Sequence, residues 1–274
     1  HALAFDDGNN LAGYNSLIPV LYSDKHGEDF LAGISGGTFV VPEFRNDIFI
    51  FSDMIKSLHE YCSKEGMVVT LGVSNENSFQ YALKFLNSTL IAYLPYYALS
   101  VRLFNVIKTE KFAFLNFLSV FAARALLWLN LLPAMLSDKS EVEVRFEVKT
   151  DDEFFRNRFS GRNYHEIKVN NVKAFYKVVK EDEIRTVYIF DFRENEQRTF
   201  RALVKAAEYI LTNEKPDLIL FIGHLRLKQF LLLRVPKKFE PQPLPLTFNI
   251  TSPSYNDYYE AMSKESNWNF GLMN

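Results

Sequence analysis

The loop Arg45–Ile50 is a candidate site for binding an anion. It joins a predicted strand ending at Pro42 to a predicted helix beginning at Phe51. The start of a helix presents backbone N–H groups without helical partners, together with a partial positive charge. Such groups hold anions, and phosphate groups in particular. We therefore predict that this loop binds a pyrophosphate.

Two segments of the sequence resemble one family of enzymes. The segments are GTFVVPEFRNDIFIFSDMIKSLHEYCSKEG, from Gly37, and VVTLGVSNENSFQYALKFLNSTLIAYLPYYAL, from Val68. They are similar to the GNAT superfamily of acyl-CoA N-acyltransferases, and specifically to its members that carry two GNAT-like units in tandem. In that family a strand followed by V-x-P-x-F/Y-R-G-x-G enters a helix, and a later strand is followed by an N-x-N-S helix. The resemblance covers about sixty residues, and the second half of the chain only by its layout.

The resemblance implies acetyl-CoA as a co-substrate, bound in a slot where the two strands that enter these helices part. In the family the first strand offers backbone groups to the pantetheine arm, here Phe39, Val40 and Val41. Asn75 and Ser78 would face the same arm from the second helix. The residues expected to hold the pyrophosphate are Arg45, Asn46, Asp47, Ile48, Phe49 and Ile50.

Some positions depart from the family pattern. The two glycines of its loop motif fall on Asn46 and Ile48, and Asp47 lies where a neutral or basic residue is more usual. Glycine lets the backbone approach phosphates closely, whereas Ile48 adds bulk and Asp47 adds like charge. The tyrosine that protonates the thiolate in the family falls on Ala82. These departures motivate a second hypothesis, a GNAT-like scaffold that has lost catalysis and serves as a binding or assembly protein linked to surface-polysaccharide biosynthesis.

As an enzyme of this family, the chain would let a primary amine attack the thioester carbonyl directly, while strand amides near Val40 polarise that carbonyl. A phenol would protonate the leaving thiolate, and a carboxylate or water would take the proton of the amine. The acceptor would be a small molecule, an amino sugar or a peptide. The residues predicted for these roles are Tyr81 as the acid, Tyr97 or Tyr96 as its substitutes, and Glu43 or Glu76 as the base.

The elements around these residues predict an α/β (α+β) fold. Apolar residues recur at three- and four-residue intervals from Phe51 to Cys62, which indicates a helix, and Met67–Val73 is an apolar run typical of a buried strand. Strands, a helix and a further buried strand recur in the same order after residue 140. We therefore expect two GNAT-like units, each a mixed twisted sheet flanked by helices, joined by an apolar helical connector.

The expected boundaries divide the chain into an N-terminal unit over 1–107 that lacks its first elements, a connector over 108–140, a second unit over 141–250 and a tail over 251–274. The strand-to-helix loop of the second unit, Phe190–Glu196, contains no glycine and three acidic residues, so it should repel a pyrophosphate. The second unit would then either wall off an acceptor cleft or give structural support.

The connector contains an apolar run, Phe112–Leu136, whose length suits a membrane span of about 20 residues. Arg124 near its centre would cost about 2.5–3.5 kcal/mol inside a bilayer. We interpret the run as a helix, or a pair of helices, buried between the two units. The alternatives are a membrane span and a helix on a membrane surface, which would give a peripheral membrane contact through 112–136.

Composition limits the remaining classes of function. The 274 residues carry 31 Lys and Arg against 33 Asp and Glu, so no nucleic-acid partner is expected. Cys62 is the only cysteine and the five histidines are scattered, which argues against disulfides and against a metal site. Nothing at the start resembles a signal peptide, so we expect a cytoplasmic protein, free or membrane-associated. The sequence leaves oligomerisation open.

Overall fold

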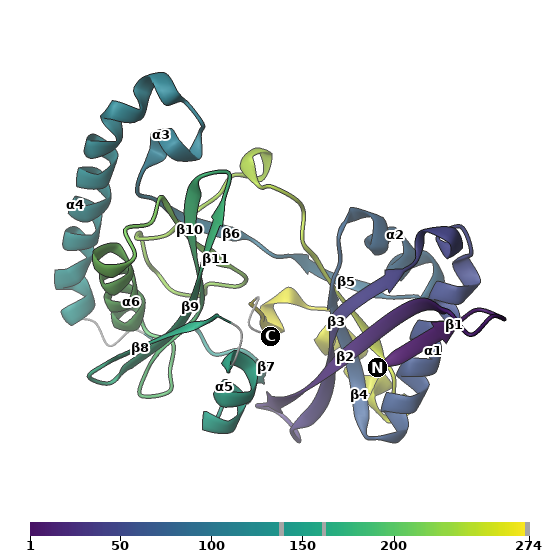
Figure 1. Cartoon of the computed structure of the whole chain (residues 1–274). Helices are drawn as coiled ribbons and strands as arrows, with labels where there is room; N and C mark the ends of the chain where they lie inside the picture. The colour runs from purple at the N-terminus through teal and green to yellow at the C-terminus, as the bar shows by residue number, and fades with distance from the viewer. Residues whose placement is uncertain (137–139, 161–162, 272–274) are drawn as a thin grey trace.

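The structure is a computed structural model that describes residues 1–136, 140–160 and 163–271. Within these ranges, the side chains that are not described are those of Ile48, Glu76, Asn77 and Glu110. The fold is mixed α/β, with two twisted sheets that lie side by side and are flanked by helices (Figure 1). Both sheets contain parallel and antiparallel neighbours. The predicted architecture of two mixed sheets is confirmed.

The first sheet has eight strands, which are β1 (Ala2–Phe5), β2 (Leu11–Asp24), β3 (Phe30–Val40), β4 (Met67–Val73), β5 (Thr89–Tyr93), β7 (Phe146–Val148), β13 (Pro245–Ile250) and β14 (Trp268–Asn269). Their order is β14-β7-β2-β3-β4-β13-β5, with β1 added beside β2. β2 and β3 form a long antiparallel hairpin that runs from Tyr22 opposite Phe30 to Gly13 opposite Val40. β3 and β4 are parallel and are joined by α1 (Ile48–Lys64), and α2 (Glu76–Phe85) follows β4.

The second sheet has six strands, which are β6 (Tyr96–Ser100), β8 (His165–Val169), β9 (Val172–Glu181), β10 (Ile184–Glu194), β11 (Leu218–Ile222) and β12 (Leu233–Arg234). Their order is β12-β6-β11-β10-β9-β8. α6 (Phe200–Asn213) connects β10 to its parallel neighbour β11. Thr199 caps the start of α6 by accepting a hydrogen bond from Ala202 N–H at 3.1 Å. The apolar face of α6 then buries itself in the core of this unit.

Strands are exchanged between the two units. The chain leaves the first sheet after β5, crosses at Leu94 and Pro95, and enters the second sheet as β6. It returns as β13, which inserts between β4 and β5, and β7 and β14 also join the first sheet. Hydrogen bonds fix the crossing, from Leu94 N–H to Leu244 O at 2.9 Å and from Gly223 N–H to Pro95 O at 3.0 Å. Membership of the sheets therefore does not follow the expected boundaries at 107, 140 and 250.

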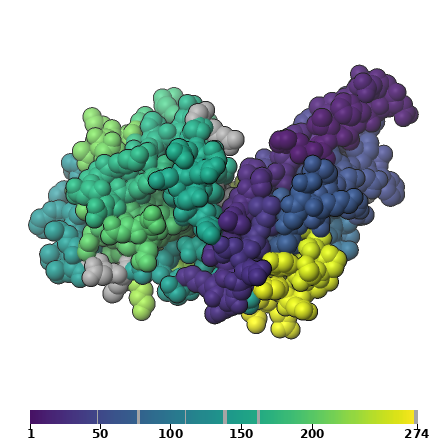
Figure 2. All heavy atoms as spheres, turned by 90° about the horizontal axis from the view of Figure 1, so that it is seen from below, coloured from purple at the N-terminus to yellow at the C-terminus, as the bar shows by residue number. Residues whose placement is uncertain are grey.

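The end of the chain packs on the first unit. Trp268 and Phe270 are buried in the core of the first sheet. The ring centroid of Trp268 lies 4.8 Å from that of Phe146 and 5.5 Å from that of Tyr22, and its Nε1–H donates to Met262 O at 2.6 Å. Figure 2 shows this segment lying against the N-terminal unit. The short helices that lead to it are η4 (Pro253–Tyr258), α7 (Tyr259–Met262) and η5 (Glu265–Asn267).

Most of the apolar run of the connector forms one helix, α4 (Asn116–Met135), and its first residues belong to the 3-10 helix η2 (Glu110–Leu115), which follows α3 (Leu103–Val106). α4 lies along the outside of the second unit and packs on α6 (Figure 1). Its buried residues are Ala123, Leu127, Asn130 and Ala134. Most of its other side chains are exposed, among them Phe121 at 72% and Trp128 at 77%. The prediction that this run is buried between the units is therefore wrong, because only one face of the helix meets the protein.

Candidate functional site

β3 and β4 part before either strand ends. Their parallel ladder ends at the pair Ile34 and Leu71. β3 continues beside β2 to Val40, and β4 continues beside β13 to Val73. The strand edges beyond Ile34 and Leu71 therefore face each other across a gap. This gap is the slot expected between the strands that enter the two helices.

Backbone amides of β3 point into the gap. Val41 N–H donates to Ala12 O at 2.9 Å, so Val41 and, two residues earlier, Phe39 direct their backbone polar groups toward β2. Along an antiparallel strand, the backbone N–H and C=O groups of successive residues point alternately to the two sides of the strand. The N–H and C=O groups of Thr38 and Val40 therefore face the gap.

The opposite edge of the gap is built in the same way. Ser74 N–H donates to Pro245 O at 3.2 Å, so the backbone of Ser74 and of Gly72 is directed toward β13. By the same alternation, Val73 turns its N–H and C=O toward the gap. An extended chain of amide groups placed in the gap would find donors and acceptors on both sides.

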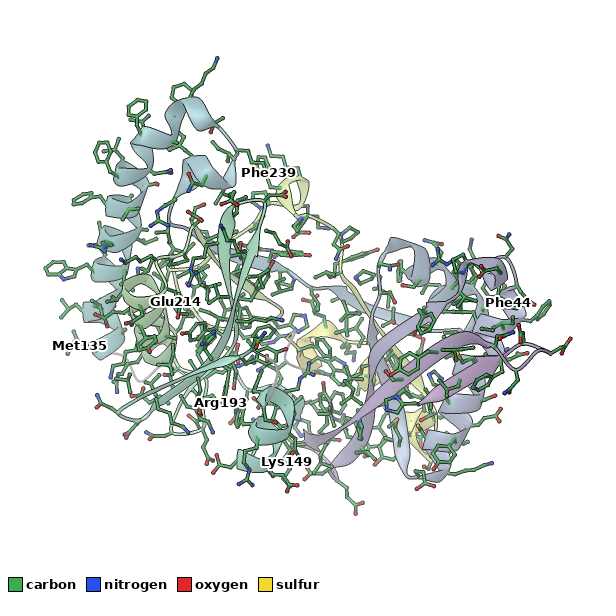
Figure 3. The ribbon with its side chains drawn as sticks, viewed as in Figure 1. Phe44, Met135, Lys149, Arg193, Glu214 and Phe239 are labelled. Carbon is green, nitrogen blue, oxygen red and sulfur yellow. The ribbon has the colours of Figure 1, made fainter. Side chains whose placement is uncertain are left out.

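A groove of about 820 Å³ lies at the mouth of the gap. It is formed by the end of β3, the 3-10 turn η1 (Pro42–Phe44) and the first turns of α1 and α2. Phe44, labelled in Figure 3, marks this end of the first unit. The residues predicted for binding or catalysis that line the groove are Phe39, Val40, Arg45, Asp47, Asn75, Ser78 and Tyr81.

The start of α1 is capped by Asp47. The apolar spacing predicted a helix from Phe51, but α1 begins earlier, because the Asp47 carboxylate accepts a hydrogen bond from Phe49 N–H at 2.9 Å. Arg45 also lines the groove, and its Nε–H donates to Val40 O at 3.0 Å. A side-chain carboxylate therefore occupies part of the N–H array that we expected to hold a pyrophosphate.

Among the described side chains, the predicted cofactor residues Val41, Asn46, Phe49 and Ile50 lie outside the groove lining. The N–H of Val41 is taken by β2, as described above. Asn46 and Phe49 are exposed, Phe49 at 74%, and Ile50 is half-buried. The side chain of Ile48 lies outside the described residues, so the expected effect of its bulk stays a prediction.

Asn75 and Ser78 form a capping box at the start of α2. Ser78 N–H donates to Asn75 Oδ1 at 2.9 Å, and Asn75 N–H donates to Ser78 Oγ at 3.1 Å. This reciprocal pair fixes the direction in which α2 leaves β4. Because both side chains line the groove, the start of α2 presents uncharged polar groups to it, whereas the start of α1 presents a carboxylate.

Among the predicted catalytic side chains that the structure describes, Tyr81 alone lines the groove. Its ring centroid lies 5.5 Å from those of both Phe51 and Phe85. Glu43 is exposed on η1 and is not part of the groove lining. The side chain of Glu76 lies outside the described residues. Tyr81 is therefore the one phenol that this geometry offers as an acid.

The two substitute tyrosines belong to the second sheet. Tyr96 and Tyr97 lie in β6, opposite Ile222 and Phe221 of β11. The Tyr96 hydroxyl donates to Gln242 O at 3.1 Å, and burial raises the pKa of Tyr96 to about 12. Burial also raises the pKa of Tyr97. Neither residue lines the groove, because the strand exchange carries both of them into the other unit.

A second cavity, of about 370 Å³, runs between α1 and α2 over the parted strands. It shares Phe51 and Ser78 with the lining of the groove, so the two spaces adjoin. His59, Ser88 and Asn249 also line it, and Asn249 Nδ2–H donates to Ser88 Oγ at 2.8 Å. Burial lowers the pKa of His59 to about 4, so its imidazole is neutral at pH 7. His59 was not among the predicted site residues, although it lies four residues after Ile55 and therefore on the apolar face of α1.

The corresponding loop of the second unit is closed. Most of the predicted loop Phe190–Glu196 continues β10, and Asp191 is buried between Arg193 and Arg198, at 2.6 Å from each. Burial alone would raise the pKa of Asp191, but the two guanidinium groups outweigh it and hold this pKa below its ordinary value. An acidic residue of this loop thus stabilises the core instead of facing a ligand.

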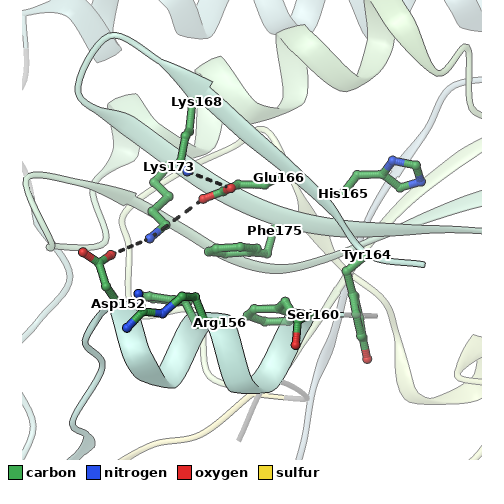
Figure 4. Close-up of a pocket in the computed structure, with 11 residues that line it drawn as sticks. Asp152, Arg156, Ser160, Tyr164, His165, Glu166, Lys168, Lys173 and Phe175 are labelled. Atoms are coloured by element: carbon green, nitrogen blue, oxygen red, sulfur yellow. Dashed lines mark hydrogen bonds and ion pairs between the residues drawn. The ribbon is translucent and has the colours of Figure 1, made fainter. Parts of the chain in front are cut away.

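The second unit has a hollow of its own, of about 440 Å³, between α5 (Asp152–Phe159), β8 and β9 (Figure 4). Phe155 and Phe175 stack within it, with centroids 4.9 Å apart. Above them, Lys173 Nζ lies 3.0 Å from Asp152 and 3.8 Å from Glu166 (Figure 4). These charges are paired with each other, and none of the predicted site residues whose side chains the structure describes lines this hollow.

Comparison with solved structures identifies the architecture. A GCN5-related N-acetyltransferase from Anabaena variabilis ATCC 29413 superposes with a TM-score of 0.53 at 8% identity, covering 91% of this chain and 62% of that chain. The chain has the GNAT fold. Eis1 from Mycobacterium abscessus matches with a TM-score of 0.52 at 10% identity, over 96% of this chain and 66% of that chain.

Saccharomyces cerevisiae N-myristoyltransferase with bound myristoyl-CoA also matches, with a TM-score of 0.51 at 12% identity, over 89% of this chain and 64% of that chain. The chain thus spans less than two thirds of the length of these three solved chains. No family profile and no curated protein matches its sequence. The resemblance stated from the sequence is confirmed at the level of the fold, with two GNAT-like units.

Proposed function

We propose that this GNAT-fold chain binds an acyl-CoA in the gap between β3 and β4 and transfers the acyl group to an amine. The observation that carries the proposal is the end of the β3–β4 ladder at Ile34 and Leu71, beyond which backbone groups of Val40 face the open groove and those of Val73 face the adjoining cavity. A pantetheine arm is an extended chain with two amides. It would pair with the free strand edges much as an added strand does.

The reaction would form a bond between the amine nitrogen and the carbonyl carbon and would break the carbon–sulfur bond of the thioester. Val40 N–H would polarise the carbonyl oxygen, which gains negative charge as the amine attacks. The departing thiolate would take the phenolic proton of Tyr81, and the proton of the amine would pass to water. We propose the amine of a small molecule, an amino sugar or a peptide as the acceptor.

The cavity beside the groove favours a short acyl group. Asn15, Thr70 and Thr247 line it and are themselves buried, and neutral His59 lies on its wall. Asn15 accepts a hydrogen bond from Thr38 Oγ1 at 2.9 Å, and Thr247 Oγ1 donates to Gly72 O at 3.4 Å. A long alkyl chain placed there would displace solvent from the remaining polar atoms of the lining, at roughly 1–3 kcal/mol for each group left unpaired. Acetyl-CoA is therefore the co-substrate that we propose.

A second function, a scaffold that binds without catalysis, is favoured by the start of α1. Asp47 already accepts the N–H of Phe49 there, and Ala82 stands where the family has its acid. Such a chain would use the groove, or the surface around it, to hold a partner in an assembly. Tyr81 would then be a packing residue between Phe51 and Phe85.

Calorimetric titration with CoA and acetyl-CoA, followed by an acetyl-transfer assay over a panel of amines, separates the two functions. Binding together with transfer that Tyr81→Phe abolishes would support the enzyme. Binding without transfer to any amine would support the scaffold, and no binding at millimolar acetyl-CoA would overturn the proposed acyl-CoA site. Tyr61→Phe, which changes an exposed phenol on α1, is the matched control.

A further inference from the structure

α4 presents a broad apolar surface that points away from the protein. Figure 3 shows its side chains projecting from the outer edge of the second unit, with Met135 near the end of the helix. Trp128 is 77% exposed and Phe121 is 72% exposed. Isolated exposed apolar side chains are ordinary, but a contiguous row of them marks an interaction surface. The α4 outer face is defined by Phe117, Phe121, Trp128, Leu129, Leu132 and Met135.

The apolar arc is broader than the seam of a helix pair. At 3.6 residues per turn, the exposed residues from Phe117 to Leu136 spread over about half of the helix circumference. The buried residues Ala123, Leu127 and Ala134 occupy the opposite side, against the second unit. Two paired helices cover only a narrow stripe on each other. A partner that covers half of a helix at once, such as a bilayer surface, fits this arc better than a second helix.

Contacts at both ends hold α4 on the protein. Near its start, Ser119 Oγ–H donates to Val101 O at 2.9 Å. Near its end, Arg201 donates to Ala134 O at 3.2 Å and to Met135 O at 3.3 Å. The helical stretch 111–135 is long and apolar enough to cross a membrane, but crossing would break these contacts and uncover α6. The packing therefore favours a helix that lies along a membrane surface.

We propose that the α4 outer face lies in the interfacial layer of a bilayer containing anionic lipids, with the helix axis parallel to the membrane. Between residues 111 and 136 the charged residues are Lys111 and Arg124, both cationic. Arg124 is exposed at one edge of the apolar arc, where its guanidinium can reach lipid phosphates while its stem covers apolar surface. Aromatic side chains such as that of Trp128 are favoured at this depth. The face thus matches a negatively charged membrane in both polarity and charge.

Trp128 supplies a direct readout, because the chain has two tryptophans and the other one, Trp268, is fully buried. The full chain should float with vesicles of phosphatidylcholine and phosphatidylglycerol at low salt, and float less with phosphatidylcholine alone. Binding should shift the Trp128 emission to the blue. Lipids brominated near the headgroup should quench this emission more than lipids brominated near the chain end. Trp128→Phe should float like the wild type and lose the shift.

Charge placed on the face should abolish binding. Phe121→Glu combined with Leu132→Glu should lower the vesicle-bound fraction roughly tenfold. The matched control is Phe230→Glu, which alters a side chain that is 76% exposed but lies outside α4. All three positions are exposed, so each variant should melt like the wild type by circular dichroism.

Three kinds of result would overturn the proposal. The first is a wild-type chain that does not float with the anionic vesicles, or a double variant that floats equally well. The second is stronger quenching from the bilayer centre, which would indicate a spanning helix. The third is a stable dimer in sedimentation that the double variant dissolves, without any vesicle binding, which would assign the face to a second copy of the chain.

Discussion

The Asp47 carboxylate accepts a hydrogen bond from Phe49 N–H at 2.9 Å, where the groove meets the start of α1. This bond places a negative charge where the proposed site would hold a pyrophosphate. Arg45 lines the same groove and supplies a positive charge, with its Nε–H bonded to Val40 O at 3.0 Å. A nucleotide entering here must displace the carboxylate or share the helix start with it.

Asp47→Asn should tighten the binding of CoA by about two- to fivefold, because asparagine keeps the helix cap and removes the like charge. The melting temperature should change little. Calorimetry measures the affinity for CoA. The control is Asp53→Asn, which removes an equal charge at an exposed position of the same helix. An unchanged affinity in Asp47→Asn would show that the carboxylate does not face the ligand.

Tyr81→Phe should lower kcat for acetyl transfer by about 10²–10⁴-fold while leaving the Kd for acetyl-CoA within a few-fold of the wild type. The reason is that the phenolic proton is needed when the thiolate leaves and not when the ligand binds. Steady-state kinetics and calorimetry on the same samples measure the two effects. Equal losses of affinity and rate would indicate a packing role between Phe51 and Phe85 instead.

The enzyme should prefer a short acyl chain, because the cavity beside the groove is lined by polar side chains. Acetyl-CoA should give a kcat/KM about 10- to 100-fold above that of myristoyl-CoA, since an alkyl chain would displace solvent from the polar side chains that line the cavity, such as Thr70 and His59. Competition between the two thioesters for one amine, followed by mass spectrometry, measures this ratio. A preference for myristoyl-CoA would refute the assignment of the cavity to a short acyl group.

The fold should lose stability in mild acid through His224. Burial lowers the pKa of His224 to about 4, with the nearby positive charge of Arg226 adding to the shift. The unfolded chain takes up this proton near pH 6.5, so between about pH 6.5 and pH 4 it binds more protons than the native state. The contribution of His224 to the free energy of unfolding is therefore fully present above about pH 6.5 and is lost as the pH falls from 6.5 to 4.

The free energy of unfolding should therefore fall less between pH 7 and pH 4.5 in His224→Gln than in the wild type, by roughly 1–3 kcal/mol. Urea denaturation at both pH values measures the change. His26→Gln, which alters an exposed histidine, should leave the wild-type slope unchanged. A wild-type slope in His224→Gln as well would assign the acid sensitivity to other groups.

Local sequence patterns predicted the elements but not the sheet that each one joins. The pattern of apolar residues is enough to place α1 and β4, and the family resemblance places α2. Tyr96 and Tyr97 were expected in the N-terminal unit, because they lie within the predicted range 1–107. Their partner is β11, far along the chain, and the choice of a distant strand depends on tertiary packing that a local pattern does not encode.

Two features of the candidate site did have local signals. Aspartate is a favoured cap residue, so Asp47 could have placed the start of α1 ahead of Phe51. His59 stands four residues after Ile55, on the face that the apolar spacing marks as buried. The exposure of α4 had no such signal, since an apolar helix has the same pattern whether protein or another apolar phase covers it.

Hydrogen–deuterium exchange with saturating acetyl-CoA tests the acyl-CoA site most directly, because the proposal rests on strand and helix amides that accept a ligand. Exchange should slow at Thr38 and Val40, at the first turn of α1 and at the start of α2, and should stay unchanged in β10 and α6. Exchange that is unaffected across residues 38–51 and 73–79, with acetyl-CoA in excess, would contradict the account.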